Sequence, residues 1–408
     1  MKLKENDNVP EIRFDYFKEE WDRKRFKDFT KLSQGLQIAI SSRFLEDGEH
    51  RYFYITNEFL NPNSTKKYYI ESPSENVICT VDDILMTRTG NTGKVITNIS
   101  GAFHNNFFKV DYDKFETSKM FLYYLLTSND IQKEIIIRAG NSTIPDLNHS
   151  DFYSIKTSVP ALAEQTAIGS LFRTIDDLLA SYKDNLTNYQ SLKVTMLSKM
   201  FPKAGQTVPE IRLDGFEGEW VEKRLKDISK RVTRKNNDLV SERALTISAQ
   251  FGLIDQEEFF QKKIASKDVS GYYLIKKGEF AYNKSYSTGY PLGAIKRLDK
   301  YENGVLSTLY ILFKAVDVDS DYLAHYYESD KWHREVSMCA AEGARNHGLL
   351  NIAPADFFNT RLVVPKELEE QRAIGSYFSN LDNLINSHQE KISQLETLKK
   401  KLLQDMFI

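Results

Sequence analysis

The chain contains an internal repeat, and no other sequence feature limits its possible folds as strongly. Aligning Leu162–Phe201 with Leu368–Phe407 gives about 16 identities in about 40 positions. A second pair of segments, Val9–Phe29 and Val208–Ile228, agrees at roughly 13 of 21 positions. The chain is therefore a tandem of two units. Each has a lead segment (Val9–Phe29 or Val208–Ile228), a variable body and a long terminal stretch.

The repeated terminal stretches are typical of long amphipathic helices. Their apolar residues recur every three or four positions in a narrow stripe, as in a coiled coil. Pro160 and Pro365 stand where we expect the first helical residue, and acidic residues follow them. Gly169 and Gly375 indicate close backbone packing of each helix against its body. A helix of about 33 residues would span roughly 50 Å, although two ordinary core helices remain an alternative.

The two bodies are predicted to be α+β with many short strands. In each body, glycine-punctuated apolar runs precede an aromatic amphipathic helix. The predicted strands of the first body are Val77–Thr80, Ile84–Arg88, Lys94–Thr97 and Phe107–Val110, followed by a helix over Lys119–Ser128. Those of the second are Tyr272–Ile275, Glu279–Tyr282, Leu292–Lys296 and Leu309–Lys314, followed by a helix over Tyr322–Glu328.

The order of these parts suggests a topology with a body at each end of two long helices. If the helices pair antiparallel, the tandem repeat becomes a pseudo-twofold, and the second helix brings Ile408 near the N-terminus. The expected boundaries are 1–158 for the first lead segment and body, 159–201 for the first helix, 202–363 for the linker with the second lead segment and body, and 364–408 for the second helix.

Composition favours a cytoplasmic protein without a membrane partner. The chain has only two cysteines, Cys79 and Cys339, far apart in sequence, and no apolar run long enough to cross a bilayer. Its net charge of −2 does not by itself indicate a nucleic-acid binder. Basic residues nevertheless cluster in Asp22–Lys31 and Glu222–Lys235, either as nucleic-acid patches or as solvated helix faces.

The usual signatures of catalysis are missing. Gly90–Lys94 ends in Gly-Lys but lacks the spacing and the hydroxyl residue of a P-loop. The Asn/Asp-Pro-Pro-aromatic loop with which amino-methyltransferases hold a flipped adenine is absent. Pro145-Asp146 is followed by no acid-x-lysine triplet of a nuclease, and the seven histidines form no metal motif. We therefore expect no catalytic residues, no metal and no cofactor of the chain's own.

Loops rich in hydrogen-bond donors are the strongest candidates for a functional site. In the first body, Arg88 can take guanine bidentately, Asn91 can read adenine, and Lys94 can hold phosphate. A plain hairpin loop is the alternative, because glycine, asparagine and threonine are also turn residues. The candidate DNA-binding residues are Arg88, Thr89, Asn91, Thr92, Lys94, Asn141, Ser142, Thr143, Asn148 and His149 in the first unit, and Lys284, Ser285, Tyr286, Ser287, Thr288, Tyr290, Arg345, Asn346 and His347 in the second.

These motifs together resemble one family. The frame V-P-x-L-x-E-Q-x-A-I-G-S-L-F, with the earlier R-T-G-N-T-G-K-V and G-N-S-T-I-P-D-L-N-H-S-D-F, looks like the DNA-specificity subunit (HsdS) of type I restriction–modification enzymes. The resemblance covers essentially the whole chain, but the second body departs from the pattern because it lacks the motifs G-N-T-G-K and S-T-I-P-D-L-N. It implies two target-recognition domains that each read half of a bipartite double-stranded DNA site.

The resemblance also implies partners that supply the chemistry. Two methyltransferase subunits would dock on the long helices and use S-adenosylmethionine. Restriction subunits would use ATP and Mg²⁺ to translocate and cleave DNA. The long helices would set the gap between the half-sites. A rival interpretation is a coiled-coil scaffold whose two bodies bind something other than DNA, and a salt-titrated DNA-binding measurement separates the two.

Overall fold

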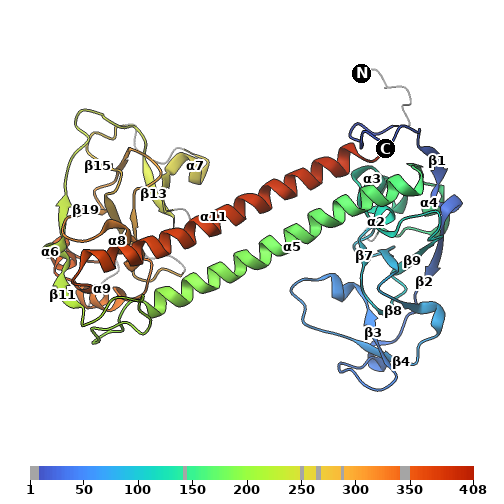
Figure 1. Cartoon of the computed structure of the whole chain (residues 1–408), viewed down its shortest axis with the longest axis horizontal. Coiled ribbons are helices and arrows are strands. Elements are labelled where there is room, and N and C mark those ends of the chain that lie inside the picture. The colour runs from blue at the N-terminus through green and yellow to red at the C-terminus, as the bar shows by residue number, and fades with distance from the viewer. Residues whose placement is uncertain (1–8, 141–144, 249–251, 263–267, 286–288, 341–349) are drawn as a thin grey trace. The chain divides into compact units, whose positions relative to one another are not determined.

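The computed structural model of the chain divides into two compact units. Unit 1 comprises residues 1–183 and 390–408, and unit 2 comprises residues 184–389. The structure describes residues 9–140, 145–248, 252–262, 268–285, 289–340 and 350–408. Both units combine short strands with short helices, and both long helices contribute to each of them (Figure 1).

Unit 1 places its lead segment, its body and the start of a long helix in one continuous run. Its elements are β1 (Asp22–Arg25), α1 (Phe26–Phe29), β2 (Thr30–Gln34), η1 (Ile40–Ser42), β3 (Arg51–Ile55), η2 (Asn57–Leu60), β4 (Tyr69–Glu71), η3 (Glu75–Val77), β5 (Ile78–Cys79), β6 (Ile84–Thr87), β7 (Val95–Thr97), β8 (Gly101–Phe103), β9 (Phe107–Tyr112), α2 (Lys119–Thr127), α3 (Asn129–Ala139), α4 (His149–Ser154), β10 (Lys156–Val159) and the first half of α5 (Leu162–Lys199). The end of α11 (Leu368–Asp405) completes it.

Unit 2 repeats this order from lead segment to helix. Its elements are β11 (Val221–Arg224), α6 (Leu225–Ile228), β12 (Ser229–Val232), β13 (Leu245–Ser248), β14 (Gly252–Asp255), α7 (Gln256–Phe260), β15 (Tyr273–Lys276), β16 (Phe280–Asn283), β17 (Ala294–Arg297), β18 (Asn303–Leu306), β19 (Ile311–Ala315), α8 (Ser320–Tyr326), α9 (His333–Cys339), α10 (Pro354–Phe358) and β20 (Arg361–Val364), with the rest of α5 and α11.

Each body contains its own four-stranded antiparallel sheet, and the two sheets have the same topology. The strand order is β2-β9-β6-β7 in unit 1 and β12-β19-β16-β17 in unit 2. All four residues of β6 are buried, which explains its continuously apolar sequence. Unit 1 adds the sheet β4-β3-β8-β5, in which only the pair β3 and β8 is parallel, whereas unit 2 adds the pairs β13-β14 and β15-β18. In both units a strand of the lead segment pairs with the strand that precedes the long helix, as β1-β10 and β11-β20.

The predicted strands lie within a few residues of observed ones, but the predicted helix starts were wrong. α5 begins at Leu162 and α11 at Leu368, so Pro160 and Pro365 precede the helices. Their carbonyl oxygens instead accept hydrogen bonds from the side chains of Gln165 and Gln371, at 2.8 and 2.9 Å. Each helix has 38 residues and is therefore roughly 57 Å long, longer than expected.

Within each unit the two long helices run antiparallel. In unit 1, Lys399 Nζ lies 2.5 Å from Asp176 Oδ1 and Lys183 Nζ lies 2.7 Å from Glu396 Oε1. In unit 2, Lys193 Nζ lies 2.5 Å from Asp382 Oδ1. The end of α11 also reaches the first lead segment, where the Ile12 N–H donates to the Asp405 carbonyl at 3.0 Å (Figure 1). No helix in the described parts of the chain is long and apolar enough to cross a membrane.

Two glycines let the long helices approach the bodies closely. A Cβ at Gly169 would lie 2.8 Å from the backbone nitrogen of Phe121 in α2, and one at Gly375 would lie 2.8 Å from that of Tyr322 in α8. Real side chains do not tolerate such distances, so the predicted close packing is confirmed. The cores around these contacts include Met406 and Phe407 in unit 1 and Met200 and Phe201 in unit 2, and each pair directly follows the last residue of a long helix.

Buried ion pairs clamp the starts of the long helices to the lead segments. Arg13 contacts both carboxylate oxygens of Glu164, at 2.6 and 2.7 Å, and Arg212 contacts those of Glu370, at 2.7 and 2.8 Å. The two glutamate side chains are only 3% and 4% exposed. The basic clusters Asp22–Lys31 and Glu222–Lys235 each span a strand, a four-residue helix and a second strand, and most of their basic residues are exposed.

Candidate nucleic-acid interface

The candidate interface of unit 1 is the loop between β6 and β7. These strands pair antiparallel from Ile84↔Thr97 to Met86↔Val95, so residues 88–94 form the tip of a hairpin. Gly90, Asn91 and Gly93 have φ values of 61°, 65° and 87°, a left-handed conformation that glycine and asparagine adopt most readily. The hairpin alternative is thus correct as local structure, and it presents the polar side chains that the sequence singled out.

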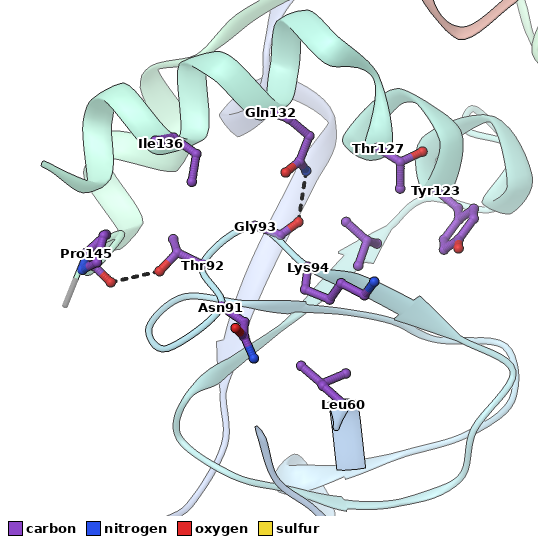
Figure 2. A pocket seen from close by; sticks show the side chains of 11 residues that line it. Leu60, Asn91, Thr92, Gly93, Lys94, Tyr123, Thr127, Gln132, Ile136 and Pro145 are labelled. Atoms are coloured by element: carbon purple, nitrogen blue, oxygen red, sulfur yellow. Dashed lines mark hydrogen bonds between the residues drawn. The ribbon is translucent and has the colours of Figure 1, made fainter. Parts of the chain in front are cut away.

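Hydrogen bonds from three other segments hold this loop in place. The Asn57 amide donates to the carbonyls of Thr89 and Gly90, at 3.1 and 2.9 Å. The Gln132 amide of α3 donates to Gly93 O at 2.8 Å, and the Thr92 hydroxyl donates to Pro145 O at 2.7 Å (Figure 2). The loop is therefore fixed by the body rather than free, as a recognition element requires.

Arg88 is hydrogen-bonded to the segment that precedes α4, which also contains candidate residues. Its Nε and Nη2 donate to Asp146 Oδ1 and Oδ2, at 3.0 and 2.7 Å, while its guanidinium carbon lies 5.4 Å from the centre of the Phe108 ring. The backbone N–H of Leu147 donates to the Arg88 carbonyl at 2.9 Å. The structure thus brings Arg88 together with the start of α4, although the two are far apart in sequence.

The candidate residues Asn148 and His149 at the start of α4 have different surroundings. Asn148 is the N-cap of α4, because its Oδ1 accepts from the Asp151 N–H at 2.9 Å. The His149 ring packs on Phe108, with ring centres 4.6 Å apart. Burial, together with the charge of Arg88, lowers the pKa of His149, so the imidazole is neutral at pH 7. Asn141, Ser142 and Thr143 lie outside the described residues.

An open pocket of about 700 Å³ lies beside the loop, between residues 91–95 and the helices α2 and α3. Figure 2 shows Asn91, Thr92 and Lys94 on one side of it and Tyr123, Thr127 and Gln132 on the other. A neighbouring groove of about 970 Å³ shares Lys94, Val95 and Tyr123 with it. Lys94 is exposed and lines both the pocket and the groove. No described carboxylate lies within ion-pair distance of its ammonium group.

The corresponding place in unit 2 is built in the same way from different side chains. The Leu350 N–H donates to the Lys284 carbonyl at 3.0 Å, as Leu147 does to Arg88. Lys284 Nζ contacts the Ile352 carbonyl at 3.3 Å, and burial lowers its pKa. The Ser285 N–H donates to Asn283 Oδ1 at 3.0 Å, and Tyr290 is partly exposed. Tyr286, Ser287, Thr288, Arg345, Asn346 and His347 lie outside the described residues.

One cluster in unit 2 has the residue types of a metal site but already has cationic partners. Ligand atoms of His325, Glu328 and Asp382 all lie within 4.8 Å of one another. The ammonium group of Lys193 contacts Glu328 at 2.7 Å and Asp382 at 2.5 Å, and Lys296 contacts Glu328 at 3.2 Å. Two lysines therefore neutralise the two carboxylates, and the cluster serves as an ion-pair network between α5, α8 and α11.

Comparisons with known proteins agree with this architecture. Residues 18–188 match the family model described as "Type I restriction modification DNA specificity domain". The chain is 23% identical over 420 residues to the type I restriction enzyme MjaVIII specificity subunit of Methanocaldococcus jannaschii, covering 99% of this chain and 96% of that protein. One part of the chain thus matches this family model, and the chain as a whole is similar to a type I specificity subunit.

Among solved structures, a type I S subunit shares the fold. The S subunit of a type I restriction–modification system from M. genitalium matches with a TM-score of 0.60 at 16% identity, covering 98% of this chain and 99% of that one. The HsdS subunit of Thermoanaerobacter tengcongensis matches with a TM-score of 0.47 at 14% identity, covering 94% and 95%.

Sequence reasoning missed several residues that shape the candidate interface. Asn57 and Gln132 hold the loop, and Asp146 holds Arg88, but none of them was among the candidates. Asp146 was considered only as part of a nuclease motif. Its actual partner is 58 positions away in sequence, so no local spacing pattern could reveal the pair.

Proposed function

We propose that this chain recognises a bipartite double-stranded DNA site for a type I restriction–modification complex, with each unit reading one half-site. The observation that carries the proposal is that in both units the residue after the central strand β6 or β16 is basic and hydrogen-bonded to the segment before α4 or α10, and that in unit 1 it begins a hairpin tip fixed by the body. A rigid element with Arg, Asn and Lys side chains suits contacts to base edges and phosphates.

The proposed complex divides the work between subunits. Two methyltransferase subunits dock on the long helices and use S-adenosylmethionine, and restriction subunits use ATP and Mg²⁺, while this chain contributes recognition and no catalysis. The helices also set the gap between the half-sites. The proposed place of action is the cytoplasm. The repeated helices support two equivalent docking surfaces, since they keep their sequence while the bodies differ.

Methylome sequencing tests this proposal. Cells that express this chain with its cognate methyltransferase should carry methylated bases in one bipartite motif with a fixed gap, and cells that express the methyltransferase alone should not. A motif that is unchanged when this chain is omitted would contradict the proposal.

DNA binding by the purified complex separates the proposal from the scaffold alternative. Phosphate contacts release counterions, so the affinity for DNA should fall steeply as salt rises. A scaffold that binds another class of ligand would show weak DNA binding with no preference for the methylated motif.

A further inference from the structure

We propose that Asp146 is a positioning residue that aims Arg88 at one guanine of the half-site read by unit 1. The inference rests on the proposed function and deepens it, because it names the base and the pair of side chains that selects it. The observation behind it is the geometry of the contact between Arg88 and Asp146.

The carboxylate takes only one edge of the guanidinium group. Asp146 accepts from Nε and Nη2 of Arg88, at 3.0 and 2.7 Å, and so occupies two of the five N–H groups. The other edge, with N–H groups on Nη1 and Nη2, meets no further acceptor among the residues that the structure describes. Guanine presents O6 and N7 in the major groove as a matching pair of acceptors, so Arg88 can bind both partners at once.

Asp146 is itself held from two sides. Its backbone N–H donates to the Ala139 carbonyl at the end of α3, at 3.2 Å, and it forms a β-bridge with Thr89. The guanidinium carbon of Arg88 lies over the Phe108 ring, 5.4 Å from its centre. The arginine therefore has its direction set before DNA arrives, which spares the rotamer entropy that a free arginine loses on binding.

Stability alone does not account for this pair. The Asp146 side chain is 51% exposed and the Arg88 side chain 19% exposed. An ion pair this open to solvent adds little to folding stability. By contrast, the ion pair between Arg13 and Glu164 is 11% and 3% exposed, as expected of a structural clamp.

Unit 2 has a different arrangement at this point. Lys284 stands where Arg88 does but contacts the Ile352 carbonyl and no described carboxylate. A lysine is a point charge without a planar fork, so it cannot pair with guanine in the same way. Among the described residues, the arrangement of an arginine aimed by a carboxylate at this point is found in unit 1, and we expect only the half-site of unit 1 to depend on Arg88.

The test compares four variants in the full complex with the cognate methyltransferase. These are Arg88→Ala, Asp146→Asn, the double variant, and the control Asp130→Asn, which removes an exposed carboxylate of α3 in the same unit. The wild-type motif is first determined by methylome sequencing. Affinities are then measured for DNA with each base pair of the motif substituted in turn, and for DNA with 7-deazaguanine, which lacks the N7 acceptor, at each guanine.

Arg88→Ala should abolish the preference for one guanine, with a loss of about 5- to 150-fold on the cognate site. Asp146→Asn should weaken the preference at that same base pair and at no other. The double variant should be no worse than Arg88→Ala, because Asp146 acts through Arg88. In the wild type, 7-deazaguanine at this position should lower the affinity, and in Arg88→Ala it should have no effect.

Three results would overturn the inference while leaving the proposed function intact. They are an Asp146→Asn variant that weakens all sequences alike, a double variant with additive losses, and a position selected by Arg88 that is not guanine. A wild-type complex that methylates no bipartite motif would instead refute the proposed function, and the inference with it.

Discussion

Arg88 and Lys284 occupy the same point of two repeated sheets, yet they are held by different partners. The carbonyl of each accepts a backbone hydrogen bond from the segment before the next helix, at 2.9 and 3.0 Å. Their side chains contact a carboxylate in unit 1 and a carbonyl in unit 2. The two units therefore keep the same backbone arrangement at this point and differ in its side chains, so under the proposed function the two half-sites should differ.

Lys94 should contribute affinity without sequence preference. It is exposed beside the pocket with no described carboxylate partner, so its charge is available to a phosphate. Replacing it with alanine should weaken binding to all sequences alike and reduce the slope of log affinity against log salt by about 1. Salt-titrated binding of the complex measures both quantities.

The matched control for Lys94 is Lys114→Ala, which removes an exposed lysine already 3.8 Å from Asp82. It should leave the salt slope nearly unchanged. A Lys94 variant that loses affinity for one sequence only would show that this lysine reads a base instead.

Glu328 should make unit 2 sensitive to acid. Burial alone would raise the pKa of Glu328, but the hydrogen bond with His325 and the charges of Lys296 and Lys193 outweigh burial and lower it well below its usual range. Because the folded pKa is depressed, the stabilisation is fully present above the unfolded pKa of about 4.3 and is lost as pH falls through lower values.

The free energy of unfolding, measured with urea between about pH 6 and pH 3, tests this pH dependence. The wild type should lose stability more steeply below about pH 4.3 than Glu328→Gln, which has no carboxyl group to protonate. Parallel curves for the two proteins would contradict the assignment.

At the scale of elements, each long helix is fixed to its unit at its first turns. The ion-pair clamps Arg13–Glu164 and Arg212–Glu370 are equivalent, but the glutamates differ in their contact with a buried tryptophan. The indole N–H of Trp220 donates to Glu370 at 3.1 Å, whereas that of Trp21 is buried without an acceptor among the described residues. Glu370 therefore satisfies one more buried donor than Glu164.

Removing either clamp should destabilise the unit that contains it. Glu164→Ala or Glu370→Ala leaves a buried arginine without a counter-charge, at a cost of about 3–5 kcal/mol. The loss should be larger by about 1 kcal/mol for Glu370→Ala, since Trp220 also loses its acceptor. Denaturant unfolding measures the total loss, and hydrogen exchange at β1 and β11 assigns it to unit 1 or unit 2.

Asp130→Ala breaks an exposed pair with Lys133 and serves as the control, with an expected change within about 0.5 kcal/mol. Equal, small effects from all three variants would show that the clamps do not hold the helices.

The elements that the sequence predicted are those with a local signal. β6 and β7 are bounded by glycine and turn residues, and their apolar runs placed them within a residue or two. β4 and β8 were not predicted, because β4 buries only one of its three residues and β8 begins with a glycine, which is typical of a turn. The helix starts were misplaced because a side-chain bond from Gln165 to Pro160, not the proline ring, organises the first turn.

For the candidate interface, the sequence predicted the loop but not its supports. The residues at the hairpin tip are polar and glycine-flanked, which is visible in the sequence. Asn57, Gln132 and Asp146 lie 33, 39 and 58 positions from the loop residues that they contact, and each is an ordinary polar residue in its own segment. Only the fold reveals that they face the same loop.

At the scale of the whole molecule, the division of the chain into two units does not coincide with the ends of the long helices. Phe201 belongs to the core of unit 2, so the segment Phe201–Thr207 lies within that unit. The division between the units falls inside the helices, at Lys183/Asp184 in α5 and Gln389/Glu390 in α11. An insertion meant to change the gap between half-sites therefore belongs at these two points, and not at Phe201–Thr207.

Matched insertions in both helices should lengthen the recognised gap. Seven helical residues at each point add about 10 Å and nearly preserve the helical phase, which corresponds to roughly 3 base pairs at 3.4 Å each. Methylome sequencing should show the same half-sites with a longer gap. An insertion in only one helix should abolish methylation, because it breaks the antiparallel register that the pairs Lys399–Asp176 and Lys193–Asp382 define. Altered half-sites with an unchanged gap would refute the role of the helices in spacing.

The core of unit 1 is closed by Met406 and Phe407, and this has a consequence for biosynthesis. A ribosome makes residues 1–183 first but delivers residues 390–408 only after the whole of unit 2. At about 5–20 residues per second, the nascent first unit must wait on the order of ten seconds or more with an open apolar surface. Unit 2, which is continuous in sequence, can mature before the unit that was begun earlier.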